Sequence, residues 1–176
     1  MKRQPLSLRP HDVCVLLQFA LQPEMTFREL SFLVGLSLGE VHNATKRLVV
    51  SRLVPPGGGM VNESACFEFL VSGVPYVFPG ELGPETRGVP TAHSGPILRE
   101  RFPEAELVVW PSAQGTVRGL SLTPLCRNAP NAAAGNPALY EWLTVVDSLR
   151  IGRARERKMA RESLEQRLLG QGGNLP

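Results

Sequence analysis

Few residues in this chain of 176 residues have the types and spacings that catalysis or metal binding requires. None of the three histidines, His11, His42 and His93, belongs to a cluster of histidines and cysteines at the spacing of a zinc site. The nearest approach to a nucleophile motif is Ser94, between His93 and Gly95, but it lacks the G-x-S-x-G elbow and a base with an orienting carboxylate. We therefore predict a protein that is not an enzyme, binds no metal and needs no cofactor.

The cysteines and the glycine run at 57–59 give no further chemical signal. Cys14, Cys66 and Cys126 are odd in number and more than fifty residues apart, which fits neither a disulfide framework nor a metal site. We expect three buried thiols. The glycine run is not followed by the Gly-Lys-Ser/Thr sequence of a phosphate-binding loop.

The most informative polar residues lie on a predicted helix over about 38–51. On this helix the apolar residues face inward, and Gly39, His42, Asn43, Lys46 and Arg47 face outward. If the helix enters a DNA groove, Asn43 can contact adenine, and Arg47 can contact guanine or phosphate. An ordinary solvated helix face carries similar residues, so the surrounding elements must decide between the two interpretations.

Two capping boxes that begin eleven residues apart indicate a helix-turn-helix around this helix. In the first, Thr26 caps a short helix and Glu29 reaches back to the cap; Ser37 and Glu40 repeat the pattern at the start of the next helix. Gly35 between them can adopt the left-handed conformation that ends a helix. A preceding amphipathic helix is expected to begin near residue 10. Two short helices joined by such a turn are typical of DNA-binding proteins.

The segment 26–54, TFRELSFLVGLSLGEVHNATKRLVVSRLV, resembles the winged-helix DNA-binding domain of MarR-type bacterial regulators. The resemblance implies that the helix over 38–51 lies in the major groove. It also implies a wing with strands at 52–54 and 67–71, from which Asn62 reaches the minor groove or the DNA backbone. The residues expected to contact DNA are Ser37, Gly39, His42, Asn43, Lys46, Arg47 and Asn62.

The middle of the chain is rich in proline. Ten of the sixteen prolines lie between residues 72 and 137, a density that disfavours long helices and central strands. The runs 107–110 and 117–122 are either short strands or apolar anchors. Several aromatic residues argue against a free linker. We predict an extended segment that wraps over the winged helix or over a partner subunit.

The C-terminal part is predicted to be helical. Asn136 can cap a helix that has Pro137 at its first position, and Gly152 is expected to kink or interrupt it. One face of this helix is apolar and either offers a surface for dimerisation or packs within one chain: Leu139, Trp142, Leu143, Val146 and Leu149.

Four arginines follow at spacings of three, four and four residues: Arg150, Arg153, Arg157 and Arg161. On a continuous helix these guanidinium groups share one edge, where their mutual repulsion disfavours the helix. Neighbouring glutamates offset part of the repulsion, so a solvated helix is one interpretation. A bound polyanion or an acidic partner is the other.

The segment 139–169, LYEWLTVVDSLRIGRARERKMARESLEQRLL, resembles the C-terminal helix of winged-helix regulators that are paired with nucleotidyltransferase-like toxins. This resemblance implies an alternative function. The protein would then be an antitoxin that binds and neutralises a partner toxin through the arginine-rich helix while regulating its own operon.

Composition and charge fit these expectations. Hydrophobic residues make up 43% of the chain and charged residues 20%, which is typical of a globular protein. Residues 1–60 carry seven Lys and Arg against four Asp and Glu, residues 61–149 five against nine, and residues 150–176 seven against three. Basic ends favour a polyanionic partner. The longest apolar run, 13–21, is too short to span a membrane.

These patterns together predict a cytoplasmic α+β protein with a winged helix-turn-helix domain over 1–72. A Pro-rich extended segment over 73–136 and a C-terminal helical region over 137–170 are expected to follow it. The predicted function is that of a homodimeric transcriptional regulator that binds double-stranded DNA.

Overall fold

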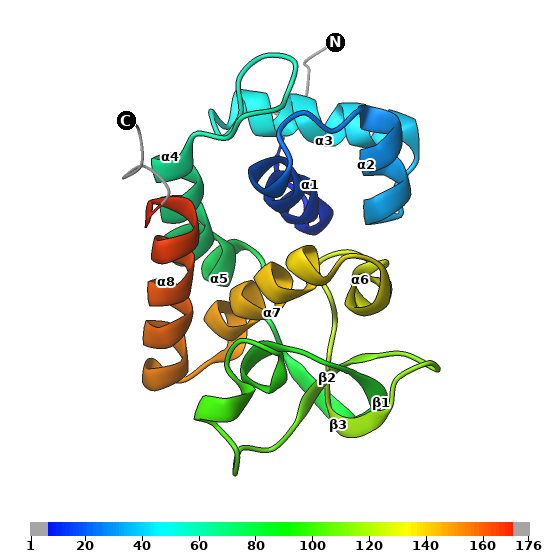
Figure 1. Cartoon of the computed structure of the whole chain (residues 1–176), viewed down its shortest axis with the longest axis vertical. Helices are drawn as coiled ribbons and strands as arrows, with labels where there is room; N and C mark the ends of the chain where they lie inside the picture. Colours follow the sequence, from blue (N-terminus) through cyan, green and yellow to red (C-terminus); the bar gives the residue numbers. More distant parts are fainter. Residues whose placement is uncertain (1–6, 171–176) are drawn as a thin grey trace.

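The computed structural model describes residues 7–170, and they form an α+β fold, as predicted. The helices span Pro10–Leu21 (α1), Phe27–Val34 (α2), Leu38–Val50 (α3), Glu63–Glu68 (α4), Val74–Val77 (α5), Ala129–Gly135 (α6), Pro137–Ile151 (α7) and Ala154–Leu168 (α8). The strands span Leu82–Pro90 (β1), Val108–Pro111 (β2) and Val117–Leu122 (β3). In Figure 1, α1 to α3 lie at one end and the strands at the other, with α6 and α7 between them and α4, α5 and α8 along one side.

Helix α1 is a central helix of the N-terminal half. Pro10 occupies its first position, as predicted, and every residue from Asp12 to Phe19 is buried. The sequence predicted a single apolar face, but α1 packs against α2 and α3 on one side and against α7 on the other. The buried polar residue Gln18 accepts a hydrogen bond of 2.9 Å from Asn136 Nδ2, which links α1 to the start of α7.

The helix-turn-helix forms at the predicted residues. Thr26 Oγ1 accepts from the Glu29 N–H, and Glu29 accepts from the Thr26 N–H, so the first capping box is complete. Gly35 ends α2 with a φ of +69° in the left-handed region, where a side chain would be strained. Ser37 Oγ accepts from the Glu40 N–H at 3.2 Å and caps α3. Helix α3 therefore begins where the second capping box predicted.

The predicted strand at 52–54 is wrong, because α3 ends in a tight turn. The Arg52 N–H donates to the Val49 carbonyl and the Leu53 N–H to the Leu48 carbonyl, while Arg52 has a φ of +60°. This is the hydrogen-bond pattern of a Schellman motif. Buried Leu53 follows the turn. The chain leaves α3 as a turn and not as the first strand of a wing.

The predicted strand at 67–71 is also wrong, because residues 63–77 are helical. Three fully buried residues, Cys66, Leu70 and Val74, recur every fourth position, which is a helical and not a strand period. Between α4 and α5, residues 69–73 form a π-helical turn. Pro75 lacks an N–H and cannot continue the regular hydrogen-bond ladder, which accounts for a wider turn here. The winged part of the expected domain is therefore replaced by helix.

The strands form a small sheet in which β1 pairs antiparallel with both β2 and β3, while β2 and β3 are parallel. The runs 107–110 and 117–122 are thus strands and not isolated anchors. The sequence did not predict β1, because its nine residues contain Pro84, Pro90, Gly83 and Gly88. A Cβ at Gly88 would clash with the carbonyl of Trp110, so glycine lets β1 and β2 approach closely.

The Pro-rich segment packs mainly on α7, and its last part also contacts the helix-turn-helix, where Asn128 Nδ2 donates to the Leu33 carbonyl at 2.8 Å. Buried Asp147 on α7 accepts hydrogen bonds of 2.7 Å from Thr91 Oγ1 and from Trp110 Nε1. Arg150 donates from Nη1 to Asp147 Oδ1 at 2.6 Å and from Nε to the Phe78 carbonyl at 2.8 Å. Side chains of α7 therefore fix three separate points of the segment.

The helical C-terminal region is divided in two. Asn136 Oδ1 accepts from the Leu139 N–H and caps α7, as predicted. Gly152 ends α7 with extended backbone, and α8 begins at Ala154, so the predicted interruption is confirmed.

The thiols of Cys14, Cys66 and Cys126 are free and buried, as expected. Among residues 7–170, the helices are too short or too polar to cross a membrane.

Candidate nucleic-acid interface

The outward face of α3 is exposed along its whole length. Its inner face is buried through Val41, Ala44 and Leu48, which hold α3 against the neighbouring helices. Because exposed residues recur at intervals of three and four, they form one continuous stripe. We call this stripe the α3 face: Ser37, Leu38, Gly39, His42, Asn43, Lys46 and Val50.

Five of the predicted DNA-contacting residues belong to the α3 face: Ser37, Gly39, His42, Asn43 and Lys46. Two apolar members were not predicted, because apolar residues on a helix were expected to face the core. Leu38 is 45% exposed and Val50 is 60% exposed. Exposed aliphatic groups on such a face can contact the methyl group of thymine.

His42 is held against α2. Its ring meets that of Phe27 edge to face, with centroids 4.7 Å apart and an angle of 73° between the planes. This contact restricts the orientation of the imidazole while the residue stays exposed. His42 is therefore a positioned polar group on the α3 face and not a freely rotating one.

The prediction that Arg47 faces outward is wrong. Arg47 donates from Nε to Asp12 Oδ2 and from Nη2 to Asp12 Oδ1, both at 2.7 Å, and its side chain is only 5% exposed. The hydrogen bonds to Asp12 raise the pKa of Arg47. Such a bidentate pair neutralises the guanidinium and joins α3 to α1. Arg47 therefore positions the α3 face from behind and is not available to contact DNA.

Glu40 takes part in the same charge cluster. Instead of completing the second capping box, its Oε2 lies 3.3 Å from His11 Nε2, 3.6 Å from Arg9 Nη1 and 3.8 Å from Arg47 Nη2. Both carboxylates near the start of α1 and α3, those of Asp12 and Glu40, are thus surrounded by basic groups. Their negative charge is compensated locally, which lowers the repulsion that they would exert on a DNA phosphate.

Asn62 is not on a wing. Its Oδ1 accepts from the Ala65 N–H at 3.1 Å, so it caps α4. Its own N–H donates to the Leu53 carbonyl and closes the loop that contains the glycine run. All three glycines at 57–59 have positive φ angles, consistent with a tight loop and not with a strand.

Two exposed arginines flank the α3 face on neighbouring segments. Arg28 lies in the first turn of α2, and Arg52 lies in the turn that ends α3. Together with Lys46 they place positive charge on three consecutive parts of the helix-turn-helix. The sequence showed both arginines, but their exposure depends on how α2 and the Schellman turn are oriented.

The predicted dimerisation surface is buried within the chain. The side chains on that face of α7 pack between the N-terminal helices and the sheet segment, and each is at most 4% exposed. They are not available to pair two copies of the protein. The residues concerned are Leu139, Trp142, Leu143, Val146 and Leu149.

The four arginines predicted to share one edge are divided by the break at Gly152. Arg150 is buried and bonded to Asp147, which corrects its assignment to a partner-binding surface. Arg153, Arg157 and Arg161 are exposed on α8, and the Arg161 guanidinium lies 5.6 Å from the centre of the Phe67 ring.

The residues considered for catalysis are used structurally. Ser94 Oγ accepts a hydrogen bond of 2.9 Å from the Val108 N–H, and His93 Nε2 lies 2.9 Å from the Glu106 carbonyl oxygen. Over the described part of the chain, no group of three or more histidine, cysteine or acidic side chains is arranged to hold a metal ion.

Comparisons of the chain with protein families, with curated proteins and with solved structures found no match.

Proposed function

We propose that this protein binds double-stranded DNA through the α3 face and acts as a transcriptional regulator. The observation that carries the proposal is the exposed stripe on the second helix of a helix-turn-helix. It combines an amide, an imidazole and an ammonium group with two aliphatic side chains. In such motifs the second helix enters the major groove, and residues near its start contact base edges.

The support behind the α3 face favours this function. Arg47 and Asp12 fix α3 on α1, and Phe27 holds the ring of His42. A rigid recognition helix loses little conformational entropy when it binds, so more of the contact energy contributes to affinity. Arg28 and Arg52 add positive charge that can displace counterions from the DNA backbone.

The roles within the α3 face follow from residue chemistry. Asn43, near the middle of α3, can donate to and accept from the edge of adenine. Lys46, one turn after His42, is suited to a phosphate, because its flexible ammonium group acts as a point charge. Leu38 can contact a thymine methyl group. The proposal assigns sequence preference to Asn43 and Leu38, and general affinity to Lys46.

The test is a selection of DNA duplexes from a random pool, followed by gel shifts with point variants. The Asn43→Ala change should weaken binding to the selected sequence by about 1 to 3 kcal/mol and reduce discrimination against other sequences. The Lys46→Ala change should weaken binding to all sequences alike and lower the salt slope by about 0.9. The matched control is Lys158→Ala, an exposed lysine on α8. Unchanged affinity in both α3 variants would reject the proposal.

A further inference from the structure

We propose that the groove between residues 97–101 and α8 binds an acidic segment of a partner protein that carries an apolar anchor residue. We call this the α8 groove. The inference goes beyond DNA binding by the α3 face, because it concerns another surface and another class of ligand. Figure 1 shows α8 along one side of the molecule, with its first turns farther from α3 than its last ones.

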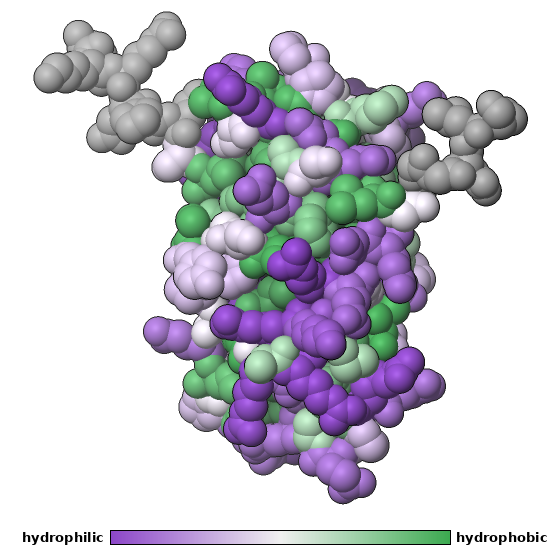
Figure 2. Space-filling view, turned by 90° about the vertical axis from the view of Figure 1, so that its left-hand side faces the viewer, coloured by the Kyte–Doolittle hydropathy of each residue, from purple (hydrophilic) through white to green (hydrophobic). Residues whose placement is uncertain are grey.

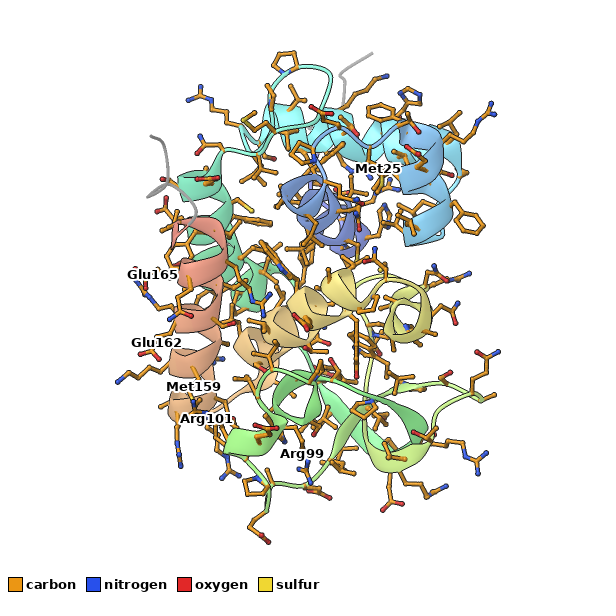
Figure 3. All side chains as sticks on the ribbon, in the orientation of Figure 1. Met25, Arg99, Arg101, Met159, Glu162 and Glu165 are labelled. Atoms are coloured by element: carbon orange, nitrogen blue, oxygen red, sulfur yellow. The ribbon has the colours of Figure 1, made fainter. Side chains whose placement is uncertain are left out.

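The α8 groove contains a small apolar part among polar and charged residues. Its volume is about 510 Å³. The apolar part consists of Leu98, which is buried, and of Ile97 and Met159, which are partly exposed. Methionine is flexible and polarisable, and it adapts to different apolar partners. Figure 3 shows the side chains of Met159 and Arg101 close together near the start of α8. The apolar part is therefore suited to one aliphatic or aromatic side chain.

Two arginines supply positive charge beside the α8 groove. Arg101 lines it and is exposed. The Arg155 guanidinium lies 5.3 Å from the centre of the Phe102 ring, on the same side of α8 as Met159 and one turn nearer the start of the helix. Within residues 7–170, neither arginine takes part in an ion pair with a carboxylate. Both are thus free to bind an external carboxylate.

The first two turns of α8 carry three more basic residues. The positive end of the helix dipole lies there and disfavours positive charge. Arg153, Arg157 and Lys158 are exposed in its first two turns, at the positive end of the helix dipole. The only acidic residue there, Glu156, accepts from the Arg153 N–H and lies 3.8 Å from His93 Nδ1. None of these three basic residues is part of the groove lining, so they add positive potential around the groove without contacting its ligand.

The acidic residues of the α8 groove do not cancel this charge. Glu162 lines the groove but is 4.0 Å from Lys158 Nζ, and both side chains are more than half exposed. Arg167, at the other end, donates to Glu141 at 3.1 Å and is satisfied. Figure 2 views this side of the molecule and shows a broad hydrophilic area interrupted by small apolar patches.

The combination of groups favours a protein segment over a nucleic acid. A phosphate backbone would satisfy the arginines but has no side chain to fill the space over Leu98 and Met159. A peptide with carboxylates on both sides of an apolar residue satisfies both requirements. Helix α3 lies across one end of the molecule and α8 along one side, so DNA bound along the α3 face would contact a different surface.

The experiment is a selection of short random peptides, displayed on phage, against the whole protein. Selected peptides should carry acidic residues around an apolar one. The double change Arg101→Glu with Arg155→Glu should raise the Kd of these peptides at least about tenfold. The matched control is Arg87→Glu with Arg127→Glu, which makes the same charge change at exposed arginines outside the groove and should alter the Kd less than about twofold. Thermal unfolding would check that every variant is folded.

Three outcomes would overturn the proposal. The first is that no peptide, or only neutral and basic peptides, are enriched. The second is that both double variants bind the selected peptides equally. The third is that a short DNA duplex of random sequence competes with the peptides for the α8 groove and loses affinity in the Arg101 and Arg155 variant, which would indicate a nucleic-acid surface. The Asn43→Ala variant should lose DNA affinity but keep its affinity for the selected peptides. Its two affinities therefore distinguish a failure of the α8 groove proposal from a failure of the α3 face proposal.

Discussion

The helix-turn-helix and the sheet segment both depend on a buried aspartate paired with an arginine, but the two aspartates have different surroundings. Asp12 lies near the surface, next to His11, whose side chain is 22% exposed, and Glu40, whose side chain is 35% exposed. Asp147 lies in the interior, where Thr91, Trp110 and Arg150 donate to it. Burial raises the pKa of Asp147, although Arg150 and the hydrogen bonds oppose the shift.

The difference shows two ways of fixing a segment. In the helix-turn-helix, local caps and glycine form the helices, and the pair of Asp12 and Arg47 only joins α1 to α3. In the sheet segment the secondary structure is short and rich in proline, so tertiary contacts must hold it. Asp147 and Arg150 bond to four points of residues 78–123: Phe78, Thr91, Trp110 and Thr123.

The largest effect is expected from Asp147→Ala. This change leaves the Arg150 charge and the Trp110 N–H buried without their partner, and removing one member of a buried pair costs about 3 to 5 kcal/mol. The free energy of unfolding from urea titration should fall by this amount. The exposed control Glu85→Ala should change it by less than about 1 kcal/mol. A loss as small as that of the control would mean that Asp147 does not hold the sheet segment.

A smaller loss is expected from Arg47→Ala. Asp12 would lose its bidentate partner, but His11 and nearby water can partly solvate it, so we expect about 3 kcal/mol, the lower end of the range for buried pairs. Urea titration measures this effect as well. Because Arg47 supports α3 from behind and does not face outward, its loss should weaken DNA binding only through a less firmly held α3 and should leave the salt slope of binding unchanged. A folded Arg47→Ala variant whose salt slope falls by about 0.9, as for a lost phosphate contact, would contradict the assignment of Arg47 to the interior.

The loss of a local cap should have a still smaller effect. Thr26→Ala removes the hydroxyl that accepts from the Glu29 N–H and should lower the free energy of unfolding by about 1 kcal/mol. Thr26→Ser, which keeps the hydroxyl, serves as the control and should restore most of the loss. If both changes have the same effect, the cap does not contribute to the stability of α2.

The smallest effect is a difference in pH dependence. Because the folded protein raises the pKa of Asp147 above its unfolded value near 3.8, folded Asp147 binds a proton more readily than unfolded Asp147. Its contribution is therefore complete below the unfolded pKa and is lost as pH rises through the folded pKa. Between pH 4 and pH 7, stability should fall more in the natural protein than in an Asp147→Asn variant, as measured by urea titration at each pH. If stability falls less in the natural protein than in the Asp147→Asn variant, folding does not raise the pKa of Asp147, and this prediction is wrong.

Sequence patterns predicted the elements whose signals are local. The caps at Thr26, Ser37 and Asn136 and the break at Gly152 all lie where expected, because each depends on residues within one helical turn. The alternation of Phe67 and Phe69 with polar residues suggested a strand, but it covers too few positions to outweigh the buried helical series that contains Leu70.

The remaining errors concern contacts between distant residues. Helical periodicity places Arg47 at the edge of the outward face, and only its contact with Asp12, 35 residues away, turns it inward. Strand β1 forms because β2 and β3 supply its partners, despite its prolines. The apolar residues of α7 were expected either to pair two copies or to pack within one chain, and the structure shows them packed within the chain.

The most direct test of the α3 face is photocrosslinking to a duplex selected by the protein. A photoreactive amino acid replaces Asn43 on α3 in one variant and Arg157 on α8 in another, both exposed positions. The proposed function predicts a crosslink to DNA from position 43 and none from position 157. A crosslink from position 157 alone, or from neither position while the duplex is bound, would contradict it.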